Sequence, residues 1–167
     1  MTREERIEKA EAAGVEAILR DDICARSAMA GLRAAFPDMI PEEMVTACLS
    51  LAGGTGSASG SCGAYCAGLM AVGLKYNSTI AEELADPAHQ KRGMDKFMEY
   101  RDRFLARWGT VLCPKIHAQL FGKEYNLADD ADHTAFLAMP GHTEKCATVV
   151  ASAVRMACEM ILPEEDK

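Results

Sequence analysis

Apolar residues recur every three or four positions along much of the chain, which is the spacing of one face of an α-helix. Near the start, Thr2 followed by Glu5 has the pattern that caps a helix N-terminus. Ile7, Ala10 and Ala17 then share one face of that segment. This pattern predicts that the chain opens with an amphipathic helix.

Proline, glycine and acidic residues divide the remaining chain into further helical stretches. Asp21 or Asp22 would cap the second stretch, which ends near Pro37 because the residue before a proline disfavours helix. Later stretches cover residues 41–52, 62–76, 86–108 and 114–120, and a final helix ends near Ile161. No segment alternates in the manner of a β-strand. The predicted fold class is all-α, a single-domain bundle of about five to seven helices over residues 1–167.

A run rich in glycine and serine precedes the fourth of these helices. Residues Gly53 to Gly60 are almost all Gly, Ser, Ala or Thr. Such a run can adopt positive φ angles and bring bare backbone amides close to another group. Ser61 is expected to cap the helix that follows, which would place Cys62 in its first turn. The run lacks the Gly-Lys-Ser or Gly-Lys-Thr ending of a P-loop, and a plain flexible linker is the alternative interpretation.

Composition and charge narrow the classes of function. A length of 167 residues with 49% hydrophobic content suits one domain with one core. The formal net charge of −7 opposes binding to nucleic acid and to anionic membrane surfaces. No apolar run is long enough to span a bilayer. Residues 1–9 are strongly charged and do not resemble a signal peptide, so the protein is expected to be cytoplasmic.

The seven cysteines are the main candidates for chemistry. The cytosol keeps thiols reduced, and an odd number cannot all pair, so free thiols or thiolate ligands are expected rather than a disulfide framework. In the first turn of a helix, Cys62 would gain from the helix dipole, which stabilises a thiolate. It is therefore the predicted attacking thiol. The alternative is a small buried residue that packs against the glycine turn.

Spacing between cysteines and histidines adds a weaker signal. No CxxC occurs, which excludes the thioredoxin motif and the common zinc-knuckle spacing, and no CxxCH occurs for covalent haem attachment. Pairs four residues apart share a helix face and could support a site. These pairs are Cys62 with Cys66, Cys113 with His117, and His142 with Cys146.

The order of four cysteines resembles that of a known family. Cys24 is followed by Cys62-Gly63-Ala64, then by Gly73-Leu74-Lys75-Tyr76, Cys113 and Cys146. This order resembles the redox-active proteins named for the pattern C, GCAxxG, C, C, over about residues 21–162. One departure is Ala67, where the family has glycine. The resemblance implies a small helical domain whose four cysteines transfer electrons or hold a redox centre.

Three hypotheses of function follow. In the first, Cys24, Cys62, Cys113 and Cys146 converge to bind an iron–sulfur cluster or another soft metal for electron transfer, because thiolates suit such ions. In the second, the protein is a metal-free thiol/disulfide oxidoreductase without a cofactor, in which Cys62 attacks and another of the four resolves. In the third, it is a helical interaction module with inert cysteines.

The sequence also sets expectations for the remaining residues and for partners. Cys48, Cys66 and Cys158 lie outside the family pattern and are expected in the core. A redox partner is expected, but nothing in the sequence identifies it. Trp108 and Phe121 are apolar residues that a homodimer would bury.

Overall fold

The computed structural model describes residues 1–164, which form a bundle of helices. Its elements are α1 (Arg3–Asp21), α2 (Cys24–Ala35), α3 (Glu42–Ala47), the 3₁₀ turn η1 (Cys48–Leu51), α4 (Ala52–Thr55), α5 (Gly63–Tyr76), α6 (Ile80–Ala85), α7 (Ala88–Trp108), α8 (Cys113–Phe121), α9 (Asp130–Leu137) and α10 (His142–Ile161). The all-α class is confirmed. None of these helices is both long and apolar enough to cross a membrane.

The number of helices exceeds the prediction. Element α4 has left-handed dihedrals at Gly53 and Gly54, so nine right-handed α-helices remain in the described part of the chain, against the five to seven expected. The additional helices are the short α6 and α9, of six and eight residues. Side chains of Thr79 and Asp129 cap their first turns. Helices this short carry too few apolar positions to show a periodic pattern.

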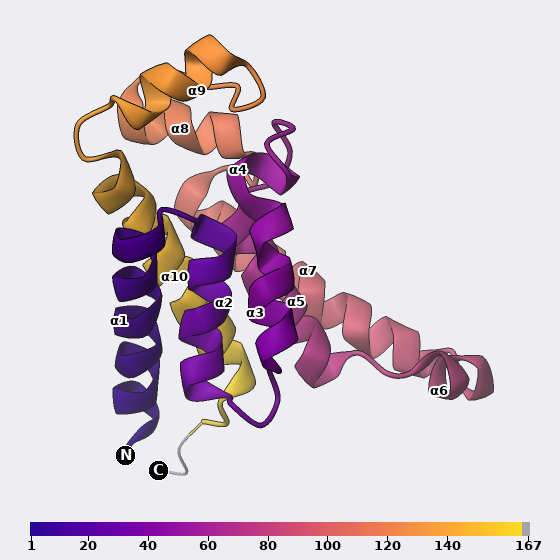
Figure 1. Cartoon of the computed structure of the whole chain (residues 1–167). Helices are drawn as coiled ribbons and strands as arrows, with labels where there is room; N and C mark the ends of the chain where they lie inside the picture. The colour runs from indigo at the N-terminus through magenta and orange to yellow at the C-terminus, as the bar shows by residue number, and fades with distance from the viewer. Residues whose placement is uncertain (165–167) are drawn as a thin grey trace.

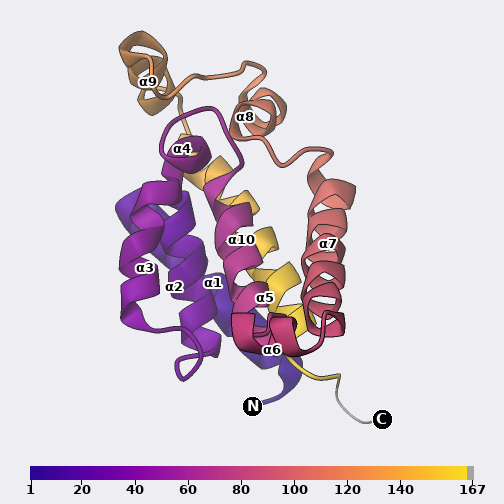
Figure 2. The same ribbon diagram turned by 90° about the vertical axis from the view of Figure 1, so that its right-hand side faces the viewer.

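Helices α1, α2, α5 and α10 lie side by side and form the body of the bundle (Figure 1). Figure 2 shows α3 beside α2 and α7 on the opposite side of α5. Helices α8 and α9 lie across one end of the bundle, close to α4 and the start of α10, whereas α6 and the first turns of α7 extend away from it. This end brings together the beginnings of α2, α5, α8 and α10.

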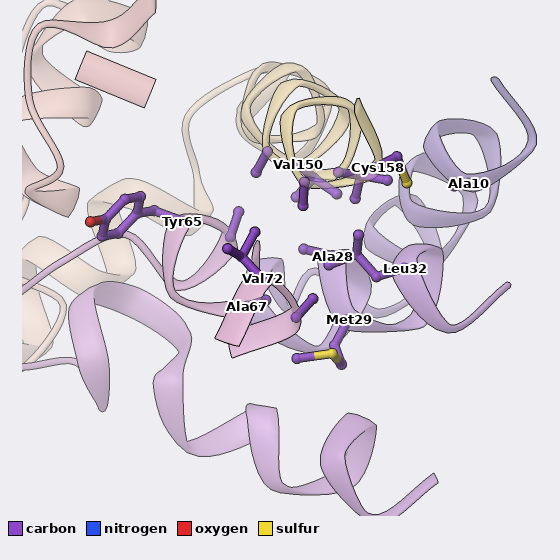
Figure 3. Close-up of a cluster of buried hydrophobic side chains, with 14 of the residues drawn as sticks. Ala10, Ala28, Met29, Leu32, Tyr65, Ala67, Val72, Val150 and Cys158 are labelled. Atoms are coloured by element: carbon purple, nitrogen blue, oxygen red, sulfur yellow. The ribbon is translucent and has the colours of Figure 1, made fainter. Parts of the chain in front are cut away.

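Small side chains dominate the core between these helices (Figure 3). A Cβ at Gly31 would lie only 2.6 Å from the carbonyl oxygen of Ala10, so the backbones of α1 and α2 almost touch. Such close packing fixes the relative positions of the helix ends. The fully buried residues include Ala10, Ala28, Met29, Leu32, Ala67, Val72, Val150 and Cys158.

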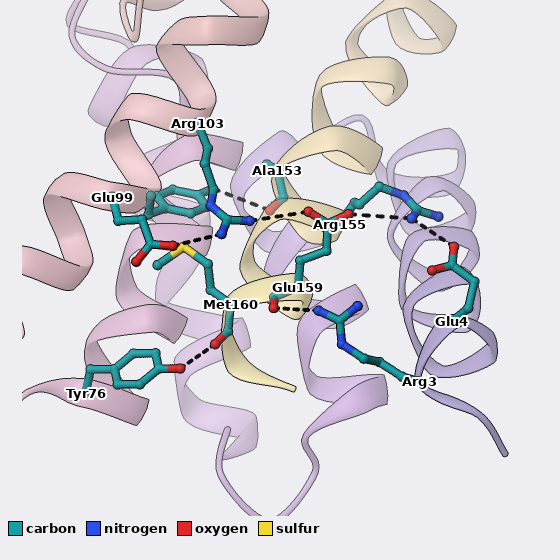
Figure 4. A network of polar contacts seen from close by, with 10 residues as sticks. Arg3, Glu4, Tyr76, Glu99, Arg103, Ala153, Arg155, Glu159 and Met160 are labelled. Atoms are coloured by element: carbon teal, nitrogen blue, oxygen red, sulfur yellow. Dashed lines mark hydrogen bonds and ion pairs between the residues drawn. The ribbon is translucent and has the colours of Figure 1, made fainter. Parts of the chain in front are cut away.

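Polar contacts fasten the C-terminal half of α10 to its neighbours (Figure 4). The Arg155 guanidinium pairs with Glu4 at 2.9 Å and with Glu11 at 2.6 Å, both on α1. The Tyr76 hydroxyl, at the end of α5, donates to the carbonyl oxygen of Met160. These partly exposed pairs each contribute at most about 1 kcal/mol. These contacts stabilise the end of the bundle at which none of the four candidate cysteines lies.

Two aromatic residues proposed for a dimer interface pack inside the chain. Trp108 is buried, and its Nε1–H donates to the hydroxyl of Ser152 at 2.9 Å. The ring of Phe121 meets those of His117 and Tyr125 edge to face. Trp108 therefore supplies little free apolar surface, whereas Phe121 is partly exposed, and a homodimer stays a prediction.

Candidate redox site

Four cysteines lie at or near the beginnings of α2, α5, α8 and α10, and these helix beginnings meet at one end of the bundle in Figure 1. Cys24 is the first residue of α2, Cys62 immediately precedes α5, and Cys113 is the first residue of α8. Cys146 lies in the second turn of α10. Three of the four sulfurs are therefore close to unpaired amides and to the positive end of a helix dipole.

The glycine-rich run forms a left-handed turn beside Cys24. The φ angles of residues 53–57 are 65°, 88°, 56°, 80° and 59°, all in the left-handed region. Glycine adopts this conformation freely, whereas Thr55 and Ser57 do so at a cost of about 1–2 kcal/mol each. The turn directs the backbone N–H of Gly53 toward the sulfur of Cys24. The expectation of positive φ angles and a bare amide near another group is confirmed.

Backbone hydrogen bonds tie the beginnings of α5 and α8 together. The N–H of Cys62 donates to the carbonyl oxygen of Val111 at 2.7 Å, and the N–H of Cys113 donates to that of Gly60 at 2.9 Å. Ser61 pairs with the chain at residue 112 in a single antiparallel bridge. The expectation that Ser61 caps α5 is wrong, because Cys62 occupies the N-cap position. The bridge brings two cysteines, distant in sequence, to the same place.

Gly63 allows the beginning of α5 to reach that of α2. A Cβ at this position would lie 2.7 Å from the carbonyl oxygen of Leu51, 2.8 Å from the Cβ of Ala25 and 3.0 Å from the Sγ of Cys24. Real Cβ atoms essentially never approach other atoms this closely. Only glycine therefore lets Cys62 stand beside Cys24.

Cys24 and Cys62 form a hydrogen-bonded thiol pair. The Cys62 S–H donates to the Cys24 sulfur, which also receives the N–H groups of Gly53, Ala25 and Ala64. The bond from Cys62 is the largest cause that lowers the pKa of Cys24, to about 6, and the amides add to it against the effect of burial. The same hydrogen bond, with burial and the charge of Cys24, raises the pKa of Cys62 well above its usual value.

The charge of the pair thus resides on Cys24, whereas the sequence pointed to Cys62 as the thiolate. Cys24 also lies at a helix N-terminus, where the dipole stabilises a thiolate as it would at Cys62. In addition, the backbone N–H groups of three residues donate to the Cys24 sulfur. Burial, followed by the charge of Cys24, raises the pKa of Cys113 to about 12 and also raises that of Cys146. The charge on Cys24 contributes to the raised pKa of each of the other three predicted residues, and to that of Cys66 as well.

A cavity of about 50 Å³ opens beside this group of thiols. Cys24, Cys113 and Cys146 line it, whereas Cys62 does not. The remaining lining residues are Ile18, Asp22, Ala52, Gly53, His117, Leu127 and Phe136. A larger groove of about 670 Å³ between α5 and α7 has no cysteine, histidine or carboxylate in its lining. The small cavity is the candidate site because three cysteines of the predicted set and a histidine line it.

His117 is the functional candidate that the sequence indicated only weakly, through its spacing from Cys113. Its Nε2 lies 3.5 Å from the Cys113 sulfur, and its ring stacks on Phe136 with centroids 4.8 Å apart. Burial lowers the pKa of His117 to about 4, so the ring is neutral near pH 7. Its Nδ1 is buried and has no hydrogen-bond partner within residues 1–164.

Residues 23–160 match the family described as "Putative redox-active protein (C_GCAxxG_C_C)", which covers most of the chain. The chain belongs to this family. No curated protein and no solved structure matches the chain. Membership of the C_GCAxxG_C_C family makes the chain a redox-active type of protein, and the geometry of its thiols bears on which chemistry it performs.

The side chains of the site do not have the arrangement of a metal centre. Among residues 1–164, no three or more His, Cys, Asp or Glu side chains are placed so that they could hold one metal ion. Cys62 is directed to the Cys24 sulfur and does not line the cavity. The four cysteines of the C_GCAxxG_C_C pattern are thus arranged with Cys24, Cys113 and Cys146 at the cavity and Cys62 against Cys24.

The three cysteines outside the C_GCAxxG_C_C pattern lie away from the cavity. Cys48 and Cys158 are fully buried, and Cys66 is partly buried one turn after Cys62. Burial raises the pKa of Cys66 to about 11 and that of Cys158 to about 12, and it also raises that of Cys48. These thiols are therefore neutral at physiological pH and pack as small apolar residues.

Proposed function

We propose that this protein is a metal-free thiol/disulfide oxidoreductase whose redox pair is Cys24 and Cys62. The observation that carries the proposal is the hydrogen bond between these two sulfurs, which come from the beginnings of different helices. A disulfide requires two sulfurs in direct reach, and the hydrogen bond brings the sulfurs of Cys24 and Cys62 together at the beginnings of α2 and α5. Membership of a redox-active family supports the proposal.

The two thiols take different roles. Cys24, as the thiolate, attacks one sulfur of a small substrate disulfide, so that an S–S bond forms to Cys24 and one substrate thiolate leaves. Cys62 then loses its proton and attacks the Cys24 sulfur, which releases the second substrate thiolate. Two electrons pass to the substrate, and a Cys24–Cys62 disulfide remains. The amides around Cys24 also make it a good leaving group when this disulfide is reduced.

Equilibration with mixtures of reduced and oxidised dithiothreitol tests the proposal. After acid quenching, mass-spectrometric mapping should find one disulfide, Cys24–Cys62. The disulfide should be lost in C24S and C62S but retained in C158S, a matched control at a buried cysteine outside the site.

Two other results would replace the proposal. Stoichiometric iron, sulfide or zinc in protein purified without oxygen, lost in single variants of Cys24, Cys62, Cys113 and Cys146, would establish a metal centre instead. No disulfide at any potential, together with no metal, would establish inert cysteines. Each outcome is distinct because the disulfide and the metal are measured separately.

A further inference from the structure

The cavity beside Cys24 is too small for a peptide or for glutathione disulfide. Its volume is about 50 Å³. One water molecule requires at least about 10–15 Å³ of such space and occupies about 30 Å³ in the liquid. The cavity therefore admits a molecule of a few non-hydrogen atoms. A reactant that enters it must be small.

The two thiols of the pair are not equivalent toward this cavity. Cys24 lines it, and Cys62 does not. Cys62 is only 6% exposed, whereas Cys24 is partly exposed. A molecule in the cavity therefore meets Cys24 first, while Cys62 remains hydrogen-bonded to Cys24 from another side. This is the order in which an attacking and a resolving thiol are needed.

One buried polar atom lacks a partner at the cavity. His117 lines it and is 4% exposed, and its Nδ1 has no hydrogen-bond partner in the described chain. A buried polar atom left unpaired costs about 1–3 kcal/mol. Ile18, Leu127 and Phe136 supply an apolar part of the lining. A small ligand with an oxygen that can both donate and accept would pair with His117, beside the thiols and the Asp22 carboxylate that also line the cavity.

We infer that a small hydroperoxide, of the size of hydrogen peroxide, is the oxidant of the Cys24–Cys62 pair and binds in this cavity. The inference rests on the proposed function and names its substrate class. The Cys24 sulfur attacks one peroxide oxygen, an S–O bond forms, the O–O bond breaks and hydroxide leaves. The Cys62 thiol then attacks the sulfenic sulfur, an S–S bond forms, and the S–O bond breaks. The oxygen released from Cys24 leaves as water with the proton of the Cys62 thiol, and the hydroxide from the first step takes up a proton to form a second water. The two thiols thus lose two electrons, and the peroxide is reduced to two molecules of water.

Size selectivity tests this inference on the reduced full-length protein. Stopped-flow measurement of disulfide formation should be at least about tenfold faster with hydrogen peroxide than with cumene hydroperoxide, because the latter exceeds the cavity. In C62S, dimedone added together with denaturant after the reaction with hydrogen peroxide should label Cys24, because the unfolded chain no longer limits the size of the reagent. Equal rates for both oxidants, or a rate with hydrogen peroxide no faster than that of free cysteine, would overturn the inference.

Variants of the cavity wall sharpen the test. L127A enlarges the cavity and should raise the rate with cumene hydroperoxide relative to hydrogen peroxide, whereas L120A, a partly buried leucine that does not line the cavity, should leave the ratio unchanged. H117F removes the buried hydrogen-bonding group. It should slow disulfide formation by hydrogen peroxide about 3- to 10-fold, which is the effect of one hydrogen bond, and H117Q should recover part of the rate. Unchanged rates in both L127A and H117F would contradict a ligand in the cavity.

The same protein separates the two proposals. Equilibration with dithiothreitol reports whether the Cys24–Cys62 disulfide exists at all, and it does not depend on how fast an oxidant enters. A disulfide at equilibrium without size selectivity would refute the peroxide inference and leave the proposed function intact. Dimedone labelling of Cys24 without any disulfide in the wild type would refute the proposed function instead.

Discussion

Replacement of Gly63 by alanine should separate the two thiols and destabilise the fold. The new Cβ would lie 2.7 Å from the Leu51 carbonyl oxygen and 3.0 Å from the Cys24 sulfur. The oxygen belongs to the backbone of η1 and cannot turn aside, and the sulfur lies at the start of α2, so α5 must move away from both. Overpacking of this kind costs about 1–3 kcal/mol. With a urea slope of about 2 kcal/mol per molar, the midpoint of unfolding should fall by about 1 M.

Gly73 provides the matched control on the same helix. A Cβ there would meet only the side-chain amide of Asn77 at 3.0 Å, which can rotate away. Alanine is favoured over glycine inside a helix by about 0.5–1 kcal/mol, so G73A should be neutral or stabilising. Urea unfolding followed by circular dichroism measures both variants.

The second readout is the thiol pair itself. Because G63A weakens the hydrogen bond from Cys62, the pKa of Cys24 should rise, and iodoacetamide should react with Cys24 more slowly at pH 7 than in the wild type. G73A should leave this rate unchanged. A G63A protein with wild-type stability and wild-type alkylation would refute the argument that glycine is required for contact between the two helix ends.

Further predictions concern the charge of Cys24 and the inert thiols. The alkylation rate of Cys24 should reach half its maximum near pH 6 in the wild type and at higher pH in C62A, which lacks the hydrogen bond. Because the folded pKa of Cys24 lies below that of a free thiol, about 8.5, the stability difference between wild type and C24A should grow as the pH rises from 6 toward 8.5 and become independent of pH below 6, as measured by urea unfolding. C158A should lose about 1–2 kcal/mol through a small core cavity and retain the Cys24–Cys62 disulfide, which mapping would show.

Helical periodicity predicted the long elements because one face of each is buried. The opening helix was expected from Thr2 and Glu5, and both halves of that capping box are present. The same box at Thr79 and Glu82 begins α6, but no apolar stripe follows it, so periodicity could not reveal the helix. A capping box that no periodic apolar face follows can therefore mark a short helix that periodicity alone does not predict.

The family was predictable from the order of four cysteines along the chain, but the contact between Cys24 and Cys62 was not. The pairing depends on a left-handed turn that turns the Gly53 amide toward Cys24, and on the close approach at Gly63. Neither is encoded in the spacing of the cysteines. The role of His117 likewise depends on its burial under Phe136, a contact between segments that only the fold brings together.

The stabilisation of a buried thiolate in this acidic chain leads to a prediction about salt. The chain has a net charge of −7, and neither lysine nor arginine lines the cavity, so side-chain cations do not hold the charge of Cys24. Hydrogen bonds from Cys62 and from three backbone amides do so. Salt screens exposed charges but hardly affects such short buried contacts. The alkylation midpoint of Cys24 should therefore move little between low salt and about 1 M salt, where the screening length is about 3 Å. A change of a full pH unit would show that distant charges set the pKa of Cys24, and the amides at the two helix beginnings would lose their assigned role.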